Sequence, residues 1–229
     1  MQYDELIPGT LIKRYKRFLA DIELEDGSVV TAHCPNSGSM KSCLEEGAPV
    51  YCSPVKDPKR KTRYTWEMIK VNDRWVGINT SIPNLLVHRW LEEGTVPGFE
   101  DYTSFRREVK WGDSRFDVQA RGPGGACFIE VKNVTLKEGN LGLFPDSVTS
   151  RGKKHLDTLV KVREAGMRAV MMYVVQRMDV EAFAPAESID PAYAAALRHA
   201  VEQGVETIAA QARVIPGTVT FERLLPVHL

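Results

Sequence analysis

Hydrophobic and polar residues alternate in short stretches through the first 80 residues of the chain. Such alternation is typical of β-strands that are buried on one face. Turn-forming residues such as Glu25-Asp26-Gly27 and Asn72-Asp73 separate the stretches. Short strands at this density predict a small closed barrel or a sandwich. The expected strands cover residues 10–24, 28–34, 49–55, 63–71 and 74–80.

After these strands the hydrophobic period lengthens, and helices begin to alternate with strands. Leu86, Val87 and Trp90 recur at the spacing of one helical face, and Gly94 follows as a stop signal. Residues 168–176 form a nearly continuous apolar run, which is typical of a strand covered on both faces. Further strands are expected at 105–111, 114–120, 126–132 and 205–214, and further helices at 151–166 and 191–204.

Together the two patterns predict an α+β, mixed protein with a barrel over residues 1–82 and an α/β domain over residues 83–229. The longest apolar run, residues 169–175, is far shorter than the roughly 20 residues that span a membrane. The acidic N-terminus lacks a signal-peptide profile, so we expect a cytoplasmic protein with no membrane partner. The four cysteines form no CxxC pair, which favours buried thiols over a zinc site.

Thirty basic residues balance thirty acidic ones, so the formal net charge is zero. This balance excludes a protein that holds nucleic acid through a global positive field. Any binding of nucleic acid must therefore come from local groups of basic residues.

The sharpest local feature is a predicted hairpin over residues 114–133. Gly122-Pro123-Gly124-Gly125 is a strong turn signal. With the turn centred between Pro123 and Gly124, Asp117 lies opposite Glu130, at a Cβ separation of about 5 Å. Lys132 points to the same side as Glu130, because side chains alternate along a strand. The other face would be apolar: Phe116, Val118, Ala120, Cys127, Ile129 and Val131.

Two facing carboxylates suit a divalent cation such as Mg2+ or Mn2+, which binds one or two carboxylates and keeps several waters. A bound cation would lower the pKa of a water and stabilise charge on a phosphate oxygen. Lys132 would position that water or stabilise the developing charge. The alternative is a solvated strand face on which Lys132 pairs with the acids. An E-x-K triplet alone is weak, since Glu108-Val109-Lys110 is a second one, but turn, register and opposing Asp117 together favour a site.

This hairpin, with a helix before it and a helix and strand after it, resembles the PD-(D/E)XK nuclease superfamily, and the whole chain resembles the sugar fermentation stimulation protein A family. The resemblance implies an N-terminal OB-like β-barrel followed by a nuclease-like α/β domain with a mixed sheet flanked by helices. It also implies DNA binding without sequence preference and a link to regulation of maltose metabolism. The nuclease motif falls on Asp117, Glu130 and Lys132. The stretches that carry the resemblance are 11–24, 31–40, 58–67, 107–117, 128–136, 144–156 and 192–206.

Some relatives place a further acid on the helix before the sheet, where this chain has Arg89. Glu92, Glu93 or Glu108 would have to supply that metal ligand. We rank Glu108 first, because its strand should neighbour the hairpin. The alternative is that Glu108 merely pairs with a lysine.

Three stripes of basic residues are candidates for contact with a polyanion. Barrels of the OB type hold single strands with such bases and with aromatic platforms, and free N–H groups at a helix start favour phosphate. One stripe alone favours a solvated surface, whereas three beside a metal-site candidate favour nucleic acid. The stripes are Lys13, Arg14, Tyr15, Lys16, Arg17 and Phe18; Lys56, Lys59, Arg60, Lys61, Arg63, Tyr64 and Trp66; and Arg151, Lys153, Lys154 and His155.

Three smaller features have competing interpretations. His155 fits a helix-surface histidine better than a phosphate ligand or proton carrier. Asp146 fits a cap of the helix 151–166 better than a partner that orients Arg151. Residues 36–39 fit an anion-binding loop and a plain turn equally well.

These observations predict a protein that binds single- or double-stranded DNA and carries a metal-dependent phosphodiesterase site. Asp117, Glu130 and Glu108 would hold the metal, and Lys132 would assist attack by water. The alternative is a non-catalytic DNA-binding regulator that retains a nuclease scaffold. An enzyme of sugar metabolism is disfavoured, since the GxGxxG and GxxxxGK[ST] nucleotide loops are both missing from the sequence.

Overall fold

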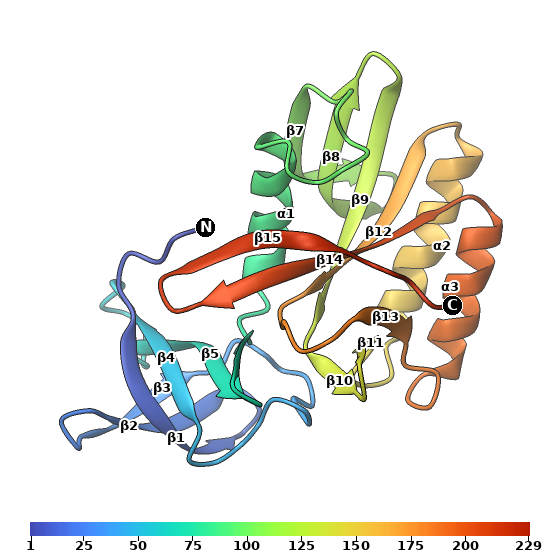
Figure 1. The fold of residues 1–229 in the computed structure, drawn as a ribbon. Helices are drawn as coiled ribbons and strands as arrows, with labels where there is room; N and C mark the ends of the chain where they lie inside the picture. The colour runs from blue at the N-terminus through green and yellow to red at the C-terminus, as the bar shows by residue number, and fades with distance from the viewer.

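Six short strands form the N-terminal part of the molecule, in a computed structural model that describes residues 1–229 (Figure 1). Their order is β3-β2-β1-β4-β5-β6, and β3 also pairs with β5, which closes the barrel. The predicted OB-like barrel is therefore confirmed. The strands are β1 (Ile7–Tyr15), β2 (Leu19–Leu24), β3 (Val29–His33), β4 (Pro49–Pro54), β5 (Tyr64–Val71) and β6 (Arg74–Gly77).

The predicted single strand over residues 10–24 is wrong, because the chain reverses within it. β1 and β2 form an antiparallel hairpin in which Tyr15 pairs with Leu19. Lys16 and Arg17 adopt φ angles of 50° and 64° in the turn. Non-glycine residues seldom occupy this left-handed region, and the sequence carries no Asn-Gly or Asp-Gly signal there. Periodicity alone therefore misses the reversal.

A six-stranded mixed sheet forms the centre of the C-terminal part, with the order β15-β14-β12-β9-β8-β7. β12 runs parallel to both β9 and β14, while the other neighbours are antiparallel. The predicted mixed sheet is thus confirmed. Its strands are β7 (Ser104–Trp111), β8 (Ser114–Gly122), β9 (Gly125–Val134), β12 (Arg168–Val175), β14 (Glu206–Ile215) and β15 (Thr218–Leu225).

Helices cover both faces of this sheet, as the pattern predicts (Figure 1). α1 (Ile82–Glu92) packs Leu86 and Trp90 against one face. α2 (Ser150–Glu164) and α3 (Pro191–Glu202) cover the other with residues such as Leu159 and Leu197. β12 has side chains in both cores, which explains its continuous apolar run.

The structure contains strands that the sequence pattern does not predict. β10 (Leu136–Glu138), β11 (Leu141–Phe144) and β13 (Ala182–Pro185) form a small separate sheet. Strands of three or four residues are too short to show a hydrophobic period in the sequence. β15 is longer, but its residues Glu222 to Leu224 are exposed and interrupt the hydrophobic alternation.

The barrel and the mixed sheet share a common core. Met68 of β5 lies in the same buried cluster as α1 and one face of the sheet. The Gly77 N–H donates to the Gln176 carbonyl (2.9 Å), and a Cβ at Gly77 would contact the Gln176 side chain at 2.5 Å. The two parts are therefore closely packed. All four cysteines are free and buried, and no helix has the length and apolar character needed to cross a membrane.

Candidate active site

The register of the β8–β9 hairpin is the one expected from its turn. Strand pairs run from Gly122–Gly125 to Val118–Ile129. Asp117 and Glu130 are the next residues beyond the last of these pairs. The sequence thus predicts correctly that the two carboxylates come from facing positions of one hairpin.

Asp117 lies where β8 and β9 stop pairing, and its carboxylate joins three elements. Its Oδ2 accepts a hydrogen bond from the Val131 N–H (2.7 Å), and its Oδ1 accepts one from Asn84 Nδ2 (2.6 Å). Asn84 lies in the first turn of α1. The helix before the sheet therefore reaches the site through the amide of Asn84 rather than through an acidic residue, which is the residue type expected there.

Glu130 is buried, with 4% of its surface exposed, and basic groups surround it. Lys132 Nζ donates to Glu130 Oε1 (2.6 Å), so Lys132 lies on the expected side of the strand. Nδ1 of His155, from α2, contacts the same oxygen and lies 2.8 Å from Lys132 Nζ. Arg151 Nε donates to Nε2 of His155 (3.4 Å), which leaves Nδ1 to donate to Glu130. His155 thus belongs to the site and is not a plain surface histidine.

The surroundings move the pKa values of the two acids in opposite directions. Burial, helped by the charge of Glu130, raises the pKa of Asp117 to about 6. Burial also raises the pKa of Glu130, but the His155 hydrogen bond and the Lys132 charge outweigh it and hold that pKa below its ordinary value. Glu130 is therefore ionised at neutral pH, whereas Asp117 titrates just below neutrality. Such divergence within one cluster is common at functional sites.

Glu108 occupies an irregular position on the neighbouring strand. It lies between the pairs Arg107–Val118 and Val109–Phe116, opposite Asp117, with a φ of 55°. Its charge contributes to the raised pKa of Asp117, although its side chain is half exposed.

Of the three acids considered as a further metal ligand, only Glu108 lies near the hairpin site. Arg115, rather than a lysine, is the ionic neighbour of Glu108, at 3.9 Å. Glu92 pairs with His88 (3.1 Å), and Arg89 and Glu93 lie near the N-terminal amino group. The structure therefore brings Glu108 close to Asp117, but neither Glu92 nor Glu93.

The prediction that only one face of the hairpin is apolar is wrong. Phe128 shares the face of Glu130, yet it is buried and packs on Phe116 at a ring-centroid distance of 5.2 Å. Both residues belong to the core beneath α2 and α3. The carboxylates therefore lie within a sheet covered on both faces, which explains their burial.

The first basic stripe divides into a structural half and an exposed half. The Arg14 guanidinium donates to the carbonyls of Arg17, Asn36 and Gly38 at 2.7, 2.8 and 3.0 Å. Tyr15 Oη donates to Asp21 (2.9 Å), and Lys13 lies 3.7 Å from the same carboxylate. The exposed half is the turn Lys16-Arg17-Phe18, in which the phenylalanine is 52% exposed.

The basic residues of the other two stripes are exposed, but the expected aromatic platform Trp66 is not: it is fully buried in the barrel core, where its indole N–H donates to the Met68 carbonyl (3.0 Å). Lys59, Arg60, Lys61 and Arg63 lie in the loop between β4 and β5. Arg151, Lys153 and Lys154 lie on the first turns of α2, where Lys153 pairs with Asp157 (3.1 Å). Because His155 follows directly, this third stripe borders the carboxylate cluster.

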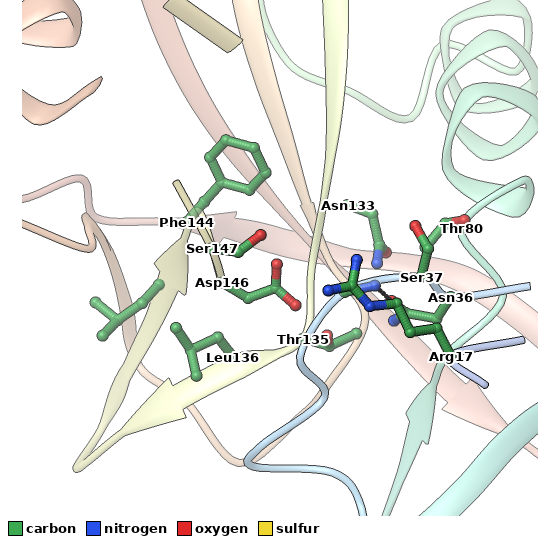
Figure 2. Close-up of a pocket in the computed structure, with 12 residues that line it drawn as sticks. Arg17, Asn36, Ser37, Thr80, Asn133, Thr135, Leu136, Phe144, Asp146 and Ser147 are labelled. Atoms are coloured by element: carbon green, nitrogen blue, oxygen red, sulfur yellow. Dashed lines mark hydrogen bonds between the residues drawn. The ribbon is translucent and has the colours of Figure 1, made fainter. Parts of the chain in front are cut away.

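A polar pocket of about 390 Å3 lies between the barrel and the mixed sheet (Figure 2). Arg17, Asn36 and Thr80 line it from the barrel side, and Asn133 and Asp146 from the other. Sequence patterns do not reveal it, because its two sides are far apart along the chain.

The expectation that Asp146 caps α2 is wrong. Thr149 is the N-cap, and its hydroxyl accepts from the Gly152 N–H (3.0 Å). Asp146 Oδ2 accepts instead from the Ser39 N–H (2.8 Å), across the two parts of the molecule.

The donor set at the hairpin suits a hard divalent cation, although no group of three or more His, Cys, Asp or Glu side chains in the molecule is arranged to hold a metal ion by itself. Burial first, and then the charge of the neighbouring Glu130, raise the pKa of Asp117. Glu130 Oε2 accepts no hydrogen bond from the protein, and each Asp117 oxygen accepts only one. Two carboxylates completed by waters match the binding mode of Mg2+.

Comparisons with known proteins cover nearly the whole chain. Residues 12–78 match the family described as the SfsA N-terminal OB domain, and residues 81–218 match the sugar fermentation stimulation protein RE domain. A sugar fermentation stimulation protein homolog of Geobacter sulfurreducens is 52% identical over 223 residues, which cover 97% of this chain and 96% of that protein. A homolog of Pelobacter propionicus is 50% identical and is covered completely, as is this chain.

A solved structure agrees with the sequence relatives. Pyrococcus furiosus SfsA, determined in complex with Ca2+, superposes with a TM-score of 0.91 at 26% identity. The match covers 100% of this chain and 98% of that chain. The resemblance expected from the sequence is thereby confirmed, and the chain belongs to the sugar fermentation stimulation protein family.

Proposed function

We propose that this protein binds DNA without sequence preference and hydrolyses a phosphodiester bond at the Asp117–Glu130 pair. The observation that carries the proposal is the pair formed by buried Glu130 and partly buried Asp117, with Lys132 Nζ 2.6 Å from Glu130. Barrels of the OB type commonly bind oligonucleotides, and the exposed bases of the β1–β2 turn and of α2 supply cationic contacts. The regulatory link to maltose metabolism rests on the family resemblance alone.

The cation in this proposal is Mg2+ or Mn2+, held by Asp117 and Glu130 with Glu108 nearby. Bound there, the ion would supply a Lewis acid for a phosphate oxygen and lower the pKa of a water. The Pyrococcus furiosus relative was solved with Ca2+, another hard, oxygen-seeking cation. That complex supports a divalent cation in this chain as well.

The side chains around the pair have distinct roles in this proposal. Asn84 and the Val131 N–H hold the Asp117 carboxylate in one orientation. Lys132 places its ammonium beside the reacting phosphate, where it orients water and stabilises negative charge. His155 donates from Nδ1 to the Glu130 carboxylate and lies beside the Lys132 ammonium, and the exposed bases of α2 hold the neighbouring phosphates.

A non-catalytic DNA-binding regulator is the second candidate. Lys132 and His155 already engage Glu130 Oε1, and Glu108, though near Asp117, is half exposed and does not complete a group of three acids that could hold a metal. Such a cluster is also consistent with a scaffold that has lost its metal. This candidate predicts DNA affinity that falls steeply with salt and that does not change when Mg2+ or Mn2+ is added.

Cleavage assays distinguish the two candidates. Purified protein is incubated with labelled single-stranded DNA, double-stranded DNA and RNA, in Mg2+, Mn2+ or EDTA. We expect metal-dependent cleavage that Asp117→Asn abolishes and that Asp113→Asn, an exposed change in the β7–β8 turn, leaves intact. Absence of cleavage with either metal, combined with unchanged DNA binding by Asp117→Ala, would refute the enzymatic proposal.

A further inference from the structure

We propose that the pocket between the barrel and the mixed sheet binds an unpaired nucleobase and prefers bases that carry an exocyclic amino group. The proposal rests on the nucleic-acid binding proposed above and qualifies it: paired DNA is held without sequence preference, and discrimination between bases arises only at this pocket, where a base is unpaired. The pocket volume of about 390 Å3 lies in the range of small-ligand sites, roughly 300–1,000 Å3.

Several polar groups at this pocket have no partner within the protein. Asn36 is buried, with 3% exposed, and uses its Oδ1 and its carbonyl but not its Nδ2. Asn133 accepts from Gln176 through Oδ1 (2.7 Å), and its Nδ2 is likewise unused. Asp146 accepts from Ser39 through Oδ2 only, which leaves Oδ1 free. A ligand with both donors and acceptors fits this set of groups.

A network of hydrogen bonds fixes the walls of the pocket. Arg14 ties the β1–β2 turn to the loop at Asn36 and Gly38. A Cβ at Gly38 would overlap the Asp146 carboxylate, so only glycine permits this close approach. The walls are therefore formed before a ligand arrives, which reduces the ordering cost of binding.

The charges favour a base inside the pocket and a phosphate at its entrance. The Asp146 carboxylate repels a phosphate but accepts hydrogen bonds from an amino group, as acidic side chains do with cytosine N4. Figure 2 shows the Arg17 guanidinium extending between the Asn36 side and the Asp146 side of the pocket. No protein acceptor engages that guanidinium, which is exposed and free to meet a phosphate.

Two neighbouring features bear on the path of a bound strand. Phe18, 52% exposed and adjacent to Arg17, offers a surface on which a second base can stack. Asn133 follows Glu130 by three residues on β9, which is about 10 Å along an extended strand. Since the two residues are an odd number apart, their side chains point to opposite faces of the strand, so a nucleic-acid strand seated in the pocket would reach the proposed cleavage site by passing around the end of β9.

The experiment compares two pyrimidines of equal size, because cytosine presents an amino donor where thymine presents a carbonyl acceptor. Fluorescein-labelled oligo-dC and oligo-dT of about 12 nucleotides, within the range bound by OB folds, are titrated with the full-length protein in EDTA. Fluorescence anisotropy gives each Kd. We expect oligo-dC to bind about tenfold more tightly than oligo-dT.

Three variants test the assignment. Asp146→Asn keeps an oxygen that accepts from the Ser39 N–H, but it replaces the free oxygen with an NH2 group that donates into the pocket. The preference should therefore reverse toward oligo-dT, because thymine presents a carbonyl acceptor. Arg17→Ala should weaken both oligonucleotides equally, and Asp113→Asn should match the wild type. Thermal denaturation confirms that each variant folds.

The outcomes separate this inference from the function on which it depends. Equal Kd values for the two oligonucleotides, or a preference that Asp146→Asn leaves unchanged, would overturn the base site while DNA binding stands. Failure to bind either oligonucleotide would overturn both. Competition by free dCMP at the same concentration as oligo-dC would show a mononucleotide site and would overturn binding of a base within a strand.

Discussion

The hairpin site and the inter-domain pocket use the same kinds of side chain in opposite ways. At the hairpin, Asp117, Glu130, Lys132 and His155 are partly or fully buried and contact one another or the backbone. At the pocket, the amide nitrogens of Asn36 and Asn133 and one Asp146 oxygen have no hydrogen-bond partner in the protein. Paired charges hold each other in a fixed geometry, whereas unpaired polar groups are available to hydrogen-bond a ligand. The difference predicts large effects of substitution at the hairpin and small ones at the pocket.

Replacing Lys132 by alanine should produce the largest effect. The change removes the only ammonium next to Glu130, and loss of one such charge-stabilising group costs about 100- to 1,000-fold in rate. We expect single-turnover cleavage in Mn2+ to fall by that factor, while the Kd for DNA changes less than about twofold. Lys132→Arg should recover part of the rate.

The Lys132 result also tests the comparison. If cleavage persisted at the wild-type rate in Lys132→Ala, the hairpin cluster would be a structural ion pair. The two regions would then differ in burial only, and not in function.

Stability should depend on pH through Asp117, by an amount comparable to the lower end of the catalytic effect. The pKa of Asp117 is about 6 when folded, against an ordinary 3.8, so protonation favours the folded state. That stabilisation is fully present below pH 4 and is lost as the pH rises through 6. It corresponds to roughly 3 kcal/mol.

Asp117→Asn isolates this contribution, because the amide cannot ionise. In EDTA we expect the variant to be more stable than the wild type at pH 7 and to lose that advantage toward pH 4. Urea denaturation at several pH values measures it. A constant difference between the two proteins across that range would contradict the raised pKa of Asp117. Asp146→Asn, the matching change at the pocket, should show no such pH dependence, which would separate the hairpin site from the pocket.

The sequence predicts the hairpin site better than the pocket for a physical reason. Asp117 and Glu130 are joined by one tight turn, so the turn signal and strand alternation fix their relation. Asn84 and His155 reach the same site from helices, and no local pattern reports that packing. Ser39 and Asp146 are 107 residues apart. Such contacts depend on how the two folded domains pack against each other, which no local sequence pattern reports.

The β1–β2 turn shows the same limit within a single hairpin. Lys16 and Arg17 adopt left-handed backbone angles, although the turn contains none of the glycine, asparagine or aspartate residues that usually indicate such angles. Strand pairing on both sides imposes those angles. The basic stripe can therefore be predicted as a feature of composition, but the exposure of Arg17 and the structural role of Arg14 emerge only from the fold.

The smallest expected effect comes from two glycines, one in each region. Gly38→Ala places a methyl group against the Asp146 carboxylate and should break its hydrogen bond to the Ser39 N–H. Loss of one such bond costs about 1 kcal/mol, and the displaced carboxylate should also abolish the preference for oligo-dC. Gly124→Ala, in the hairpin turn, meets no atom within 4 Å and should change the free energy of unfolding by less than about 0.5 kcal/mol.

Urea denaturation and oligonucleotide binding of the two glycine variants complete the comparison. A Gly38→Ala protein with wild-type stability and an intact base preference would mean that Asp146 can shift without consequence. The pocket would then be a loose surface hollow. A loss of stability and of base preference in Gly38→Ala but not in Gly124→Ala would instead show that the pocket, although it has no internal ion pairs, depends on the close approach of the Gly38 backbone to the Asp146 carboxylate. The pocket would then be as fixed in shape as the hairpin, while its polar groups remain free for a ligand.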